Sequence, residues 1–565
     1  MLPGLVSTVL STGVALVLGV AAARLTLPLW RGRAHVGVAY GVGGIGLVSM
    51  AVFVGYWMHP ALGAVVAIAL MATAIAIVIA TRAWRLVAAG WPVLALTVAV
   101  LLCYLGLLYF WGSDAESYGS VYWHFGDLGL PPDNTLPFLF SDTIAAGTPT
   151  HHFFEDWNGS DRPPLQAGFL LLIRSLTSFT GGVSTFSFGA SVVCQLLWVP
   201  VLFAALRSVG TARRAAFIAV VFAAATGTVL FNTLYTWPKL LSAAFVISAC
   251  VVLIDAIRQP RAFRAAFPAA VVLFVLGMLS HGAAAFSLPL VIWLGVLSYR
   301  RQPPRRVLAS SAVALAAGLL VYLPWLAFQR FADPPGDRLL KWHLLGITRP
   351  DGRSFGAALV DQFSALTPGE WIAARLQNLD TVFEPNPFSG VSCLCEESVL
   401  GRRSTEFFTT TTALGIALPL IVAILLLLLV RRARGVALSS ADGGFVAAVA
   451  ASVACVLFWC LLMYGGGTTV VHQGSHVWIL LLLAAPIAWL ARRRRTRWIA
   501  WAAVAVHGAV AVLVYLPQPT GSTGAQPGAA IMAAIGVALA ALAWRGLLPA
   551  PVFSRPVARR MPTSR

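Results

Sequence analysis

Long apolar runs recur along this chain, separated by short turns rich in Gly, Pro or Arg. Each run has about 20 residues, enough for a helix to cross the hydrocarbon core of a bilayer. Lipid offers the backbone no hydrogen-bond partners, so such runs must pair their own N–H and C=O groups, as helices do. The alternating segments of a β-barrel are not seen. The pattern therefore predicts an all-α polytopic membrane protein with about fifteen transmembrane helices. These are expected at residues 3–27, 36–57, 61–82, 91–111, 187–207, 215–231, 239–256, 264–280, 283–299, 306–327, 409–430, 443–464, 474–491, 497–516 and 527–545.

Two long polar intervals interrupt the apolar runs, at residues 112–186 and 328–408. Of the 20 Asp and Glu residues, eight lie in the first interval and ten in the second, and only Asp255 and Asp442 lie elsewhere. Both intervals are predicted to be large loops on one side of the membrane. The expected organisation is extra N-terminal helices at 1–90, a core at 91–327 that includes the first loop, the second loop at 328–408, C-terminal helices at 409–546 and a basic tail at 547–565.

The basic residues set the predicted orientation. A net charge of +19 could indicate a nucleic-acid partner, but most Arg residues form short clusters between apolar runs. Cytoplasmic loops carry such clusters in membrane proteins. The clusters that follow residues 207, 299, 430 and 491 are therefore placed inside, which puts the two polar loops and the N-terminus on the exoplasmic side. The tail is then cytoplasmic and near anionic headgroups. We expect a lipid bilayer and no nucleic acid as partner.

One segment decides on which side of the membrane the later loops are placed. Leu165 to Phe179 is apolar, but it is short and contains Arg174. If it crossed the membrane, every later loop would change sides. We therefore expect it to form an interfacial helix along the membrane surface.

The first loop holds the most informative order of residues. It contains Pro132-Asp133-Asn134, then Ser141 to Gly147, then Trp157-Asn158-Gly159-Ser160-Asp161-Arg162-Pro163-Pro164-Leu165. This order resembles the GT-C superfamily of membrane glycosyltransferases, in the branch of protein O-mannosyltransferases and the aminoarabinose transferase of lipid A. The likeness covers residues 90–260. Asn134 stands where that branch has Glu, and Arg162 where it has Lys.

The resemblance implies a GT-C-like fold and a reaction. A sugar would pass from a polyprenyl-phosphate-linked donor to an envelope acceptor, unidentified by the sequence, at the exoplasmic face of a bacterial plasma membrane, with no cofactor and no metal. Asp133 occupies the position of the family's base, and Arg162 that of its phosphate-binding cation. A carboxylate can accept the acceptor's proton, and a guanidinium fork can hold a phosphate.

The residues leave other interpretations open. Asp133 could cap a helix after Pro132. Asp114 and Glu116, just past a helix end, are rival bases, although a solvated helix exit explains them as well. Arg162 could be an interfacial anchor. Lys239 lies at the outer start of a helix, directly after Trp237-Pro238. It is a second candidate phosphate contact, or it belongs to the belt of aromatic and cationic residues at the membrane interface. A transporter or lipid flippase, or a non-catalytic scaffold, would carry a similar number of helices.

Overall fold

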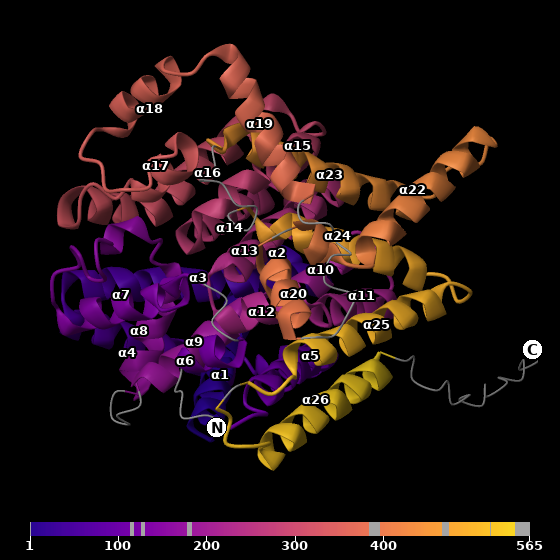
Figure 1. The fold of residues 1–565 in the computed structure, drawn as a ribbon, viewed down its shortest axis with the longest axis horizontal. Coiled ribbons are helices and arrows are strands. Elements are labelled where there is room, and N and C mark those ends of the chain that lie inside the picture. Colours follow the sequence, from indigo (N-terminus) through magenta and orange to yellow (C-terminus); the bar gives the residue numbers. More distant parts are fainter. Residues whose placement is uncertain are drawn as a thin grey trace, which may run out of the picture.

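The computed structural model describes residues 2–112, 118–125, 130–177, 183–383, 396–408, 410–465, 474–519 and 521–547. These residues form an all-helical protein, with helices over 81% of the chain and no strands in the described parts. Figure 1 shows the helices as a bundle with several shorter helices at one end. The prediction of an all-α protein is confirmed.

The helix bounds follow the chain in five groups. The N-terminal helices are α1 (Leu2–Leu25), α2 (Leu27–Trp30), α3 (Ala34–Met58), α4 (Pro60–Ala80) and α5 (Trp84–Leu108). The first polar interval holds α6 (Gly119–Phe125), the 3₁₀ turn η1 (Pro132–Asn134), α7 (Leu136–Ala146), the 3₁₀ turn η2 (Gly159–Asp161) and α8 (Leu165–Thr177). The middle helices are α9 (Val183–Leu196), α10 (Trp198–Ser208), α11 (Arg213–Ala224), α12 (Gly227–Tyr235), α13 (Lys239–Arg258), α14 (Phe263–Ser280), α15 (Leu288–Tyr299) and α16 (Pro304–Ala327).

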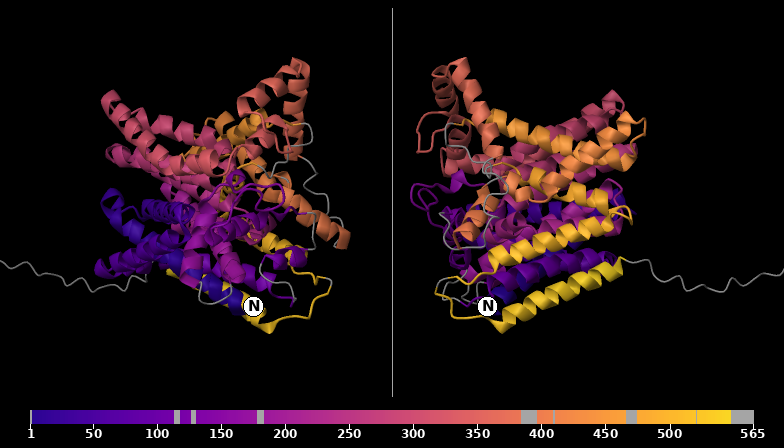
Figure 2. Two further views of the ribbon diagram at one scale, coloured as in Figure 1. Left: turned by 90° about the vertical axis from the view of Figure 1, so that its left-hand side faces the viewer. Right: turned by 45° about the vertical axis from the view of Figure 1, so that its right-hand side comes forward.

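The second polar interval begins with a π-helical turn, η6 (Phe328–Ala332). It continues with α17 (Arg338–Leu345), α18 (Phe355–Ser364), α19 (Pro368–Phe383) and α20 (Glu396–Phe408). The C-terminal helices are α21 (Thr410–Leu414), α22 (Ala417–Ala433), α23 (Ser440–Leu462), α24 (His476–Ala491), α25 (Arg497–Tyr515) and α26 (Pro527–Gly546). Figure 2 shows α25 and α26 on one flank of the bundle, away from α17–α19.

Twelve helices of the described residues are long and apolar enough to cross a membrane. A thirteenth span is formed if α11 and α12, which meet at a bend of 68°, are counted as one. The predicted spans at 409–430 and 474–491 correspond to α22 and α24, which have only 17 and 16 residues. A multi-pass membrane protein is therefore confirmed, whereas the total of about fifteen spans stays a prediction.

The most central helix is α13. The protein covers 89% of its apolar span, and the same share of the span formed by α9 and α10. In contrast, the span of α16 is only 17% covered, and α4 and α26 only 22%. Burial of apolar surface thus distinguishes a dry core from lipid-facing helices. The first residue of α13 is Lys239, so this lysine sits where the core meets the polar loops.

The two polar intervals lie at the same end of the bundle, because they contact each other directly. Arg338 of the second interval forms an ion pair with Asp156 of the first, with 3.0 Å between Nη1 and Oδ1. The Trp157 and Trp342 rings stack with their centroids 6.2 Å apart. Which side of the membrane this end faces stays a prediction.

The other end carries the two acids that lie outside the loops. Asp255, near the end of α13, pairs with Arg33, and Asp442, in the first turn of α23, pairs with Arg431 at 3.4 Å. Both acids are thus neutralised by an Arg, so the remaining Arg residues give this end a strong positive charge. We refer to it as the arginine-rich end.

Helix α8 has 13 residues, about 20 Å at 1.5 Å per residue, which is too short to cross a bilayer. Its residues from Leu165 to Ile173 are all buried against neighbouring helices, chiefly α3 and α9. An interfacial helix with one face in lipid would leave part of this stretch uncovered. The part of α8 that follows the Arg162 motif is therefore packed into the protein, which fixes that motif to the core, whereas the position of α8 at the membrane surface stays a prediction.

Candidate functional site

Asp133 and Arg162 are placed by two short 3₁₀ turns of the first loop. Asp133 is the middle residue of η1, and Arg162 directly follows η2. A capping box closes η2, because the Asn158 and Asp161 side chains each bind the other's backbone N–H. Arg162 is extended, as the following proline requires. The guanidinium is therefore presented from a stiff segment of chain.

The two side chains form an ion pair, with Arg162 Nη2 against Asp133 Oδ1. Only 11% of the Arg162 side chain and 12% of the Asp133 side chain are exposed. The guanidinium also lies over the Trp157 ring, with Cζ 4.3 Å from its centroid. Arg162 Nε is buried and has no hydrogen-bond partner in the part of the chain that the structure describes. The pair therefore leaves donor capacity on Arg162 unused.

Asn134 has a structural role next to Asp133. Its side chain is fully buried, and Oδ1 accepts a hydrogen bond of 2.6 Å from the Tyr122 hydroxyl. The Tyr235 hydroxyl donates to the Pro131 carbonyl, which also lies 2.8 Å from the Tyr122 hydroxyl, so the single Tyr122 proton is shared between this carbonyl and Asn134 Oδ1. These contacts anchor η1. The position that holds Glu in the resembling family therefore fixes the Asp133 turn here and offers no second carboxylate.

Lys239 is the most unusual cation of the site. Its side chain is 2% exposed, and Nζ has no hydrogen-bond acceptor among the residues that the structure describes. Nζ lies 3.9 Å from the centroid of the Trp237 ring. The ammonium interacts electrostatically with both Asp133 and Arg162. The structure thus brings Lys239 within electrostatic reach of Asp133 and Arg162, whereas a phosphate-binding role for these three residues stays a prediction.

A strained turn sets the start of α13. Thr236 has a φ of +62°, a left-handed conformation that is unusual for a β-branched residue. Its carbonyl accepts hydrogen bonds from Gln166 Nε2 at 3.1 Å and from Gln195 Nε2 at 3.4 Å. Gln195 Oε1 in turn accepts from the Leu241 N–H at 3.1 Å. Buried glutamines on α8 and α9 therefore hold the turn that orients Trp237 and Lys239.

A small pocket opens beside the ion pair. Its walls are Asp133, Pro137, Arg162, Pro163, Trp237, Pro238, His281, Gly282 and Leu339. The free space is about 20 Å³, room for about one water molecule. With the ion pair closed, the pocket cannot hold a sugar phosphate. Opening the pair is therefore required for any larger ligand.

Histidines give this region neutral hydrogen-bond donors. His281 Nδ1 accepts a hydrogen bond of 3.0 Å from the Ala283 N–H, so the ring proton resides on Nε2. Burial, together with the positive charges of Lys239 and Arg162, holds the pKa of His281 well below its usual range. The same causes lower the pKa of His343 to about 3. Both rings are therefore neutral at physiological pH.

The second loop completes the site through a residue that sequence reasoning missed. Asp333 is fully buried and accepts hydrogen bonds from Thr150 Oγ1, the Ser160 N–H and His151 Nδ1 at 3.0–3.1 Å. Arg338 lies over the Trp157 ring at 3.8 Å, so this ring contacts two guanidiniums, those of Arg338 and Arg162. A single acid in a polar loop carries no sequence signal for this docking role.

Two predicted site residues, Asp114 and Glu116, lie outside the described residues. Among the described residues, no three His, Cys, Asp or Glu side chains are grouped closely enough to hold a metal ion. Searches for similar proteins extend this picture no further. No protein-family model, curated protein or solved structure matches the chain.

Proposed function

We propose that this protein is a membrane glycosyltransferase of the GT-C type, which moves a sugar from a polyprenyl-phosphate-linked donor to an envelope acceptor. The acceptor reaction takes place at the polar-loop end of the bundle, which we place on the exoplasmic side. One observation carries the proposal: Asp133 and Arg162 line one pocket, and Lys239, which has no hydrogen-bond acceptor among the described residues, lies over the Trp237 ring on the wall of that pocket.

The charges favour an anionic ligand. Arg162 and Asp133 neutralise each other, so Lys239 in its protonated form gives the site one net positive charge. A buried charge without a partner is destabilising by several kcal/mol on an order-of-magnitude scale. A phosphate group supplies the missing anion and accepts from several donors at once. The neutral Nε2–H of His281, on the pocket wall, adds a donor that carries no charge.

The ion pair couples donor binding to activation of the base. The donor phosphate competes with Asp133 for the Arg162 guanidinium, so binding releases the carboxylate. Asp133 then accepts the proton of the acceptor hydroxyl while its oxygen bonds to the anomeric carbon. The bond from that carbon to the phosphate oxygen breaks, and the phosphate leaves with the electron pair. Arg162 and Lys239 stabilise the growing charge on this leaving group.

The test is a transfer assay on the purified protein in vesicles. Mass spectrometry of envelope glycans from a deletion strain first identifies the missing sugar, and a short-chain polyprenyl-phosphate carrying that sugar is the donor. Asp133→Asn should lower turnover by about 10²–10⁴-fold. Donor affinity should be unchanged or tighter, because Arg162 loses its internal partner. Asp142→Asn is the matched control, since Asp142 pairs with Arg174 in the same loop.

Arg162 variants separate charge from geometry. Arg162→Ala should weaken both donor binding and turnover, and Arg162→Lys should recover part of each, because a point charge still attracts phosphate. If Asp133→Asn keeps full activity while Asp114→Asn or Glu116→Gln abolishes it, the base lies at the start of the loop. If none of the three acids matters, transport or scaffolding replaces the transferase proposal.

A further inference from the structure

A second cavity lies at the arginine-rich end, where α14 and α16 begin. Its volume is about 720 Å³, and Arg264, Arg305 and Arg306 line it together with Pro303, Ser310 and Val313. The two helices pack against each other along their length. The loop before α16 is held to the start of α14, because Gln302 Nε2 donates to the Pro260 carbonyl at 2.9 Å. The cavity is therefore a fixed feature of this helix pair.

The charge of this cavity is uncompensated. No carboxylate lines it, and none of the three guanidiniums forms an ion pair with a described acid. Arg306 Nη1 donates to Gln302 Oε1 at 2.9 Å, but Arg306 Nε is buried without a partner. The two acids at the arginine-rich end, Asp255 and Asp442, already form ion pairs with Arg33 and Arg431. An anionic ligand would complement the charge of the three guanidiniums, of which Arg264 and Arg305 are exposed.

The opening of the cavity adjoins the lipid-facing side of α16. Leu308 is 74% exposed, Val313 57% and Leu315 63%, and the span of α16 is the least covered of all candidate spans. A ligand that reaches the guanidiniums along this face passes over apolar side chains. It therefore needs an anionic head and hydrocarbon chains, which a free phosphate lacks.

We propose that this cavity binds the headgroup of an anionic glycerophospholipid that carries two phosphodiester groups, with its acyl chains along α16. Guanidinium forks can hold two phosphate oxygens each, and three positive charges are offset more fully by two phosphodiester groups than by one. Basic pockets between transmembrane helices take such headgroups. This proposal is independent of the transferase proposal, because the cavity and the Asp133 pocket lie at opposite ends of the bundle.

The test is native mass spectrometry of the full chain released from nanodiscs that contain cardiolipin, phosphatidylglycerol and phosphatidylcholine. The wild type should retain cardiolipin in preference to both other lipids. The triple variant Arg264→Gln, Arg305→Gln, Arg306→Gln should lose that preference by at least about tenfold. The matched control is Arg432→Gln, Arg494→Gln, Arg495→Gln, which removes the same charge from exposed positions at the same end.

Two further measurements make the test of the lipid site conclusive. A variant with Lys at the three cavity positions retains the charge and should keep part of the preference, even if the Gln variant folds poorly. Inorganic phosphate at millimolar concentration should not displace the bound lipid. Equal retention by the Gln variant, equal loss by the control variant, or displacement by phosphate would each overturn the proposal.

Discussion

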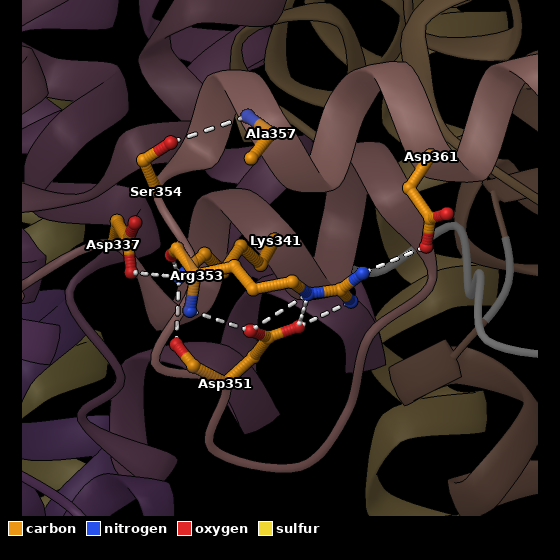
Figure 3. A network of polar contacts seen from close by, with 7 residues as sticks. All are labelled: Asp337, Lys341, Asp351, Arg353, Ser354, Ala357 and Asp361. Atoms are coloured by element: carbon orange, nitrogen blue, oxygen red, sulfur yellow. Dashed lines mark hydrogen bonds and ion pairs between the residues drawn. The ribbon is translucent and has the colours of Figure 1, made fainter.

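The chain has only two lysines, and the surroundings of these two residues differ sharply. Lys341 of α17 is 1% exposed, and its Nζ donates to the Asp351 and Arg353 carbonyls at 2.8 and 2.5 Å and pairs with Asp337 at 3.0 Å. Figure 3 shows Lys341 within this network. Lys239 is 2% exposed, yet among the described residues its Nζ has no hydrogen-bond acceptor and lies against the face of the Trp237 ring.

The difference separates a structural cation from a binding cation. Around Lys341, acceptors from the loop that joins α17 and α18 enclose the ammonium, so the residue holds that loop in place. Around Lys239, the protein supplies an ion pair nearby but no acceptor of its own. Burial without a partner penalises the protonated form of an amine, so in the proposed function an anionic ligand supplies the missing partner. In the proposed function, the unpaired Lys239 therefore lowers the stability of the ligand-free protein and raises its affinity for the anionic donor.

For the two lysines and their surroundings, the largest expected effect comes from replacing Lys239. Lys239→Met keeps the length of the side chain and removes its charge. Donor affinity should fall by about 10–100-fold, as expected when one charge-assisted hydrogen bond is lost. Unfolding temperature in nanodiscs should not fall, because an unpaired buried charge has been removed. Unchanged donor affinity, measured by equilibrium binding, would remove Lys239 from the site.

The second effect comes from the structural lysine. Lys341→Met leaves two backbone acceptors and Asp337 without their cation, which should lower local stability by about 1–3 kcal/mol. Hydrogen exchange of the amides between Gly346 and Ser354 should accelerate, while donor affinity changes less than twofold. Arg353→Gln is the control in the same network, since its pairs with Asp351 and Asp361 are exposed. A loss of donor affinity in Lys341→Met would erase the distinction between the two lysines.

The smallest effect concerns pH. His343, two residues after Lys341, has its pKa lowered to about 3 by burial and by Lys239 and Arg162. The unfolded chain binds a proton near pH 6.5 that the folded chain binds only near pH 3, so stability falls as pH falls through this window. The slope is about 1.4 kcal/mol per pH unit for this residue.

Unfolding measured between pH 7 and pH 5 checks this expectation. His343→Gln should flatten the slope, and the exposed His152→Gln should not. In Lys239→Met, the His343 contribution should shrink, since a positive charge that opposes protonation is gone. A slope that is identical in the wild type and in His343→Gln would contradict the assignment of this histidine as buried and neutral.

Sequence reasoning brought Asp133 and Arg162 to one site because their order along the first loop resembles a known pattern. It placed Lys239 at the outer start of a helix from the flanking Trp237 and Pro238. It could not predict Asp333, whose three donors come from another loop. Nor could it predict that His281 exposes Nε2–H, since this depends on a backbone N–H that only the folded turn supplies.

The helix pattern was read less completely at residues 215–231, where one straight span was expected. The structure breaks this span between α11 and α12, and α20 packs against the break. A Cβ at Gly227 would lie 1.8 Å from Glu406 Oε2, so the close approach requires glycine. Glu406 lies 179 positions further along the chain. The pattern of apolar residues predicts that a segment is buried, but it does not predict which distant residue packs against the segment and bends it.

The left-handed turn at Thr236 affects both the thermal stability of the protein and the geometry on which the proposed transfer depends. A β-branched residue in this conformation stores about 1–2 kcal/mol of strain, which glycine at the same position would relieve. The same replacement would loosen the backbone that aims Trp237 and Lys239 into the site. Thr236→Gly would therefore make the protein more stable while disturbing the geometry of the candidate site, so stability and the proposed transfer activity set opposite demands on this one position.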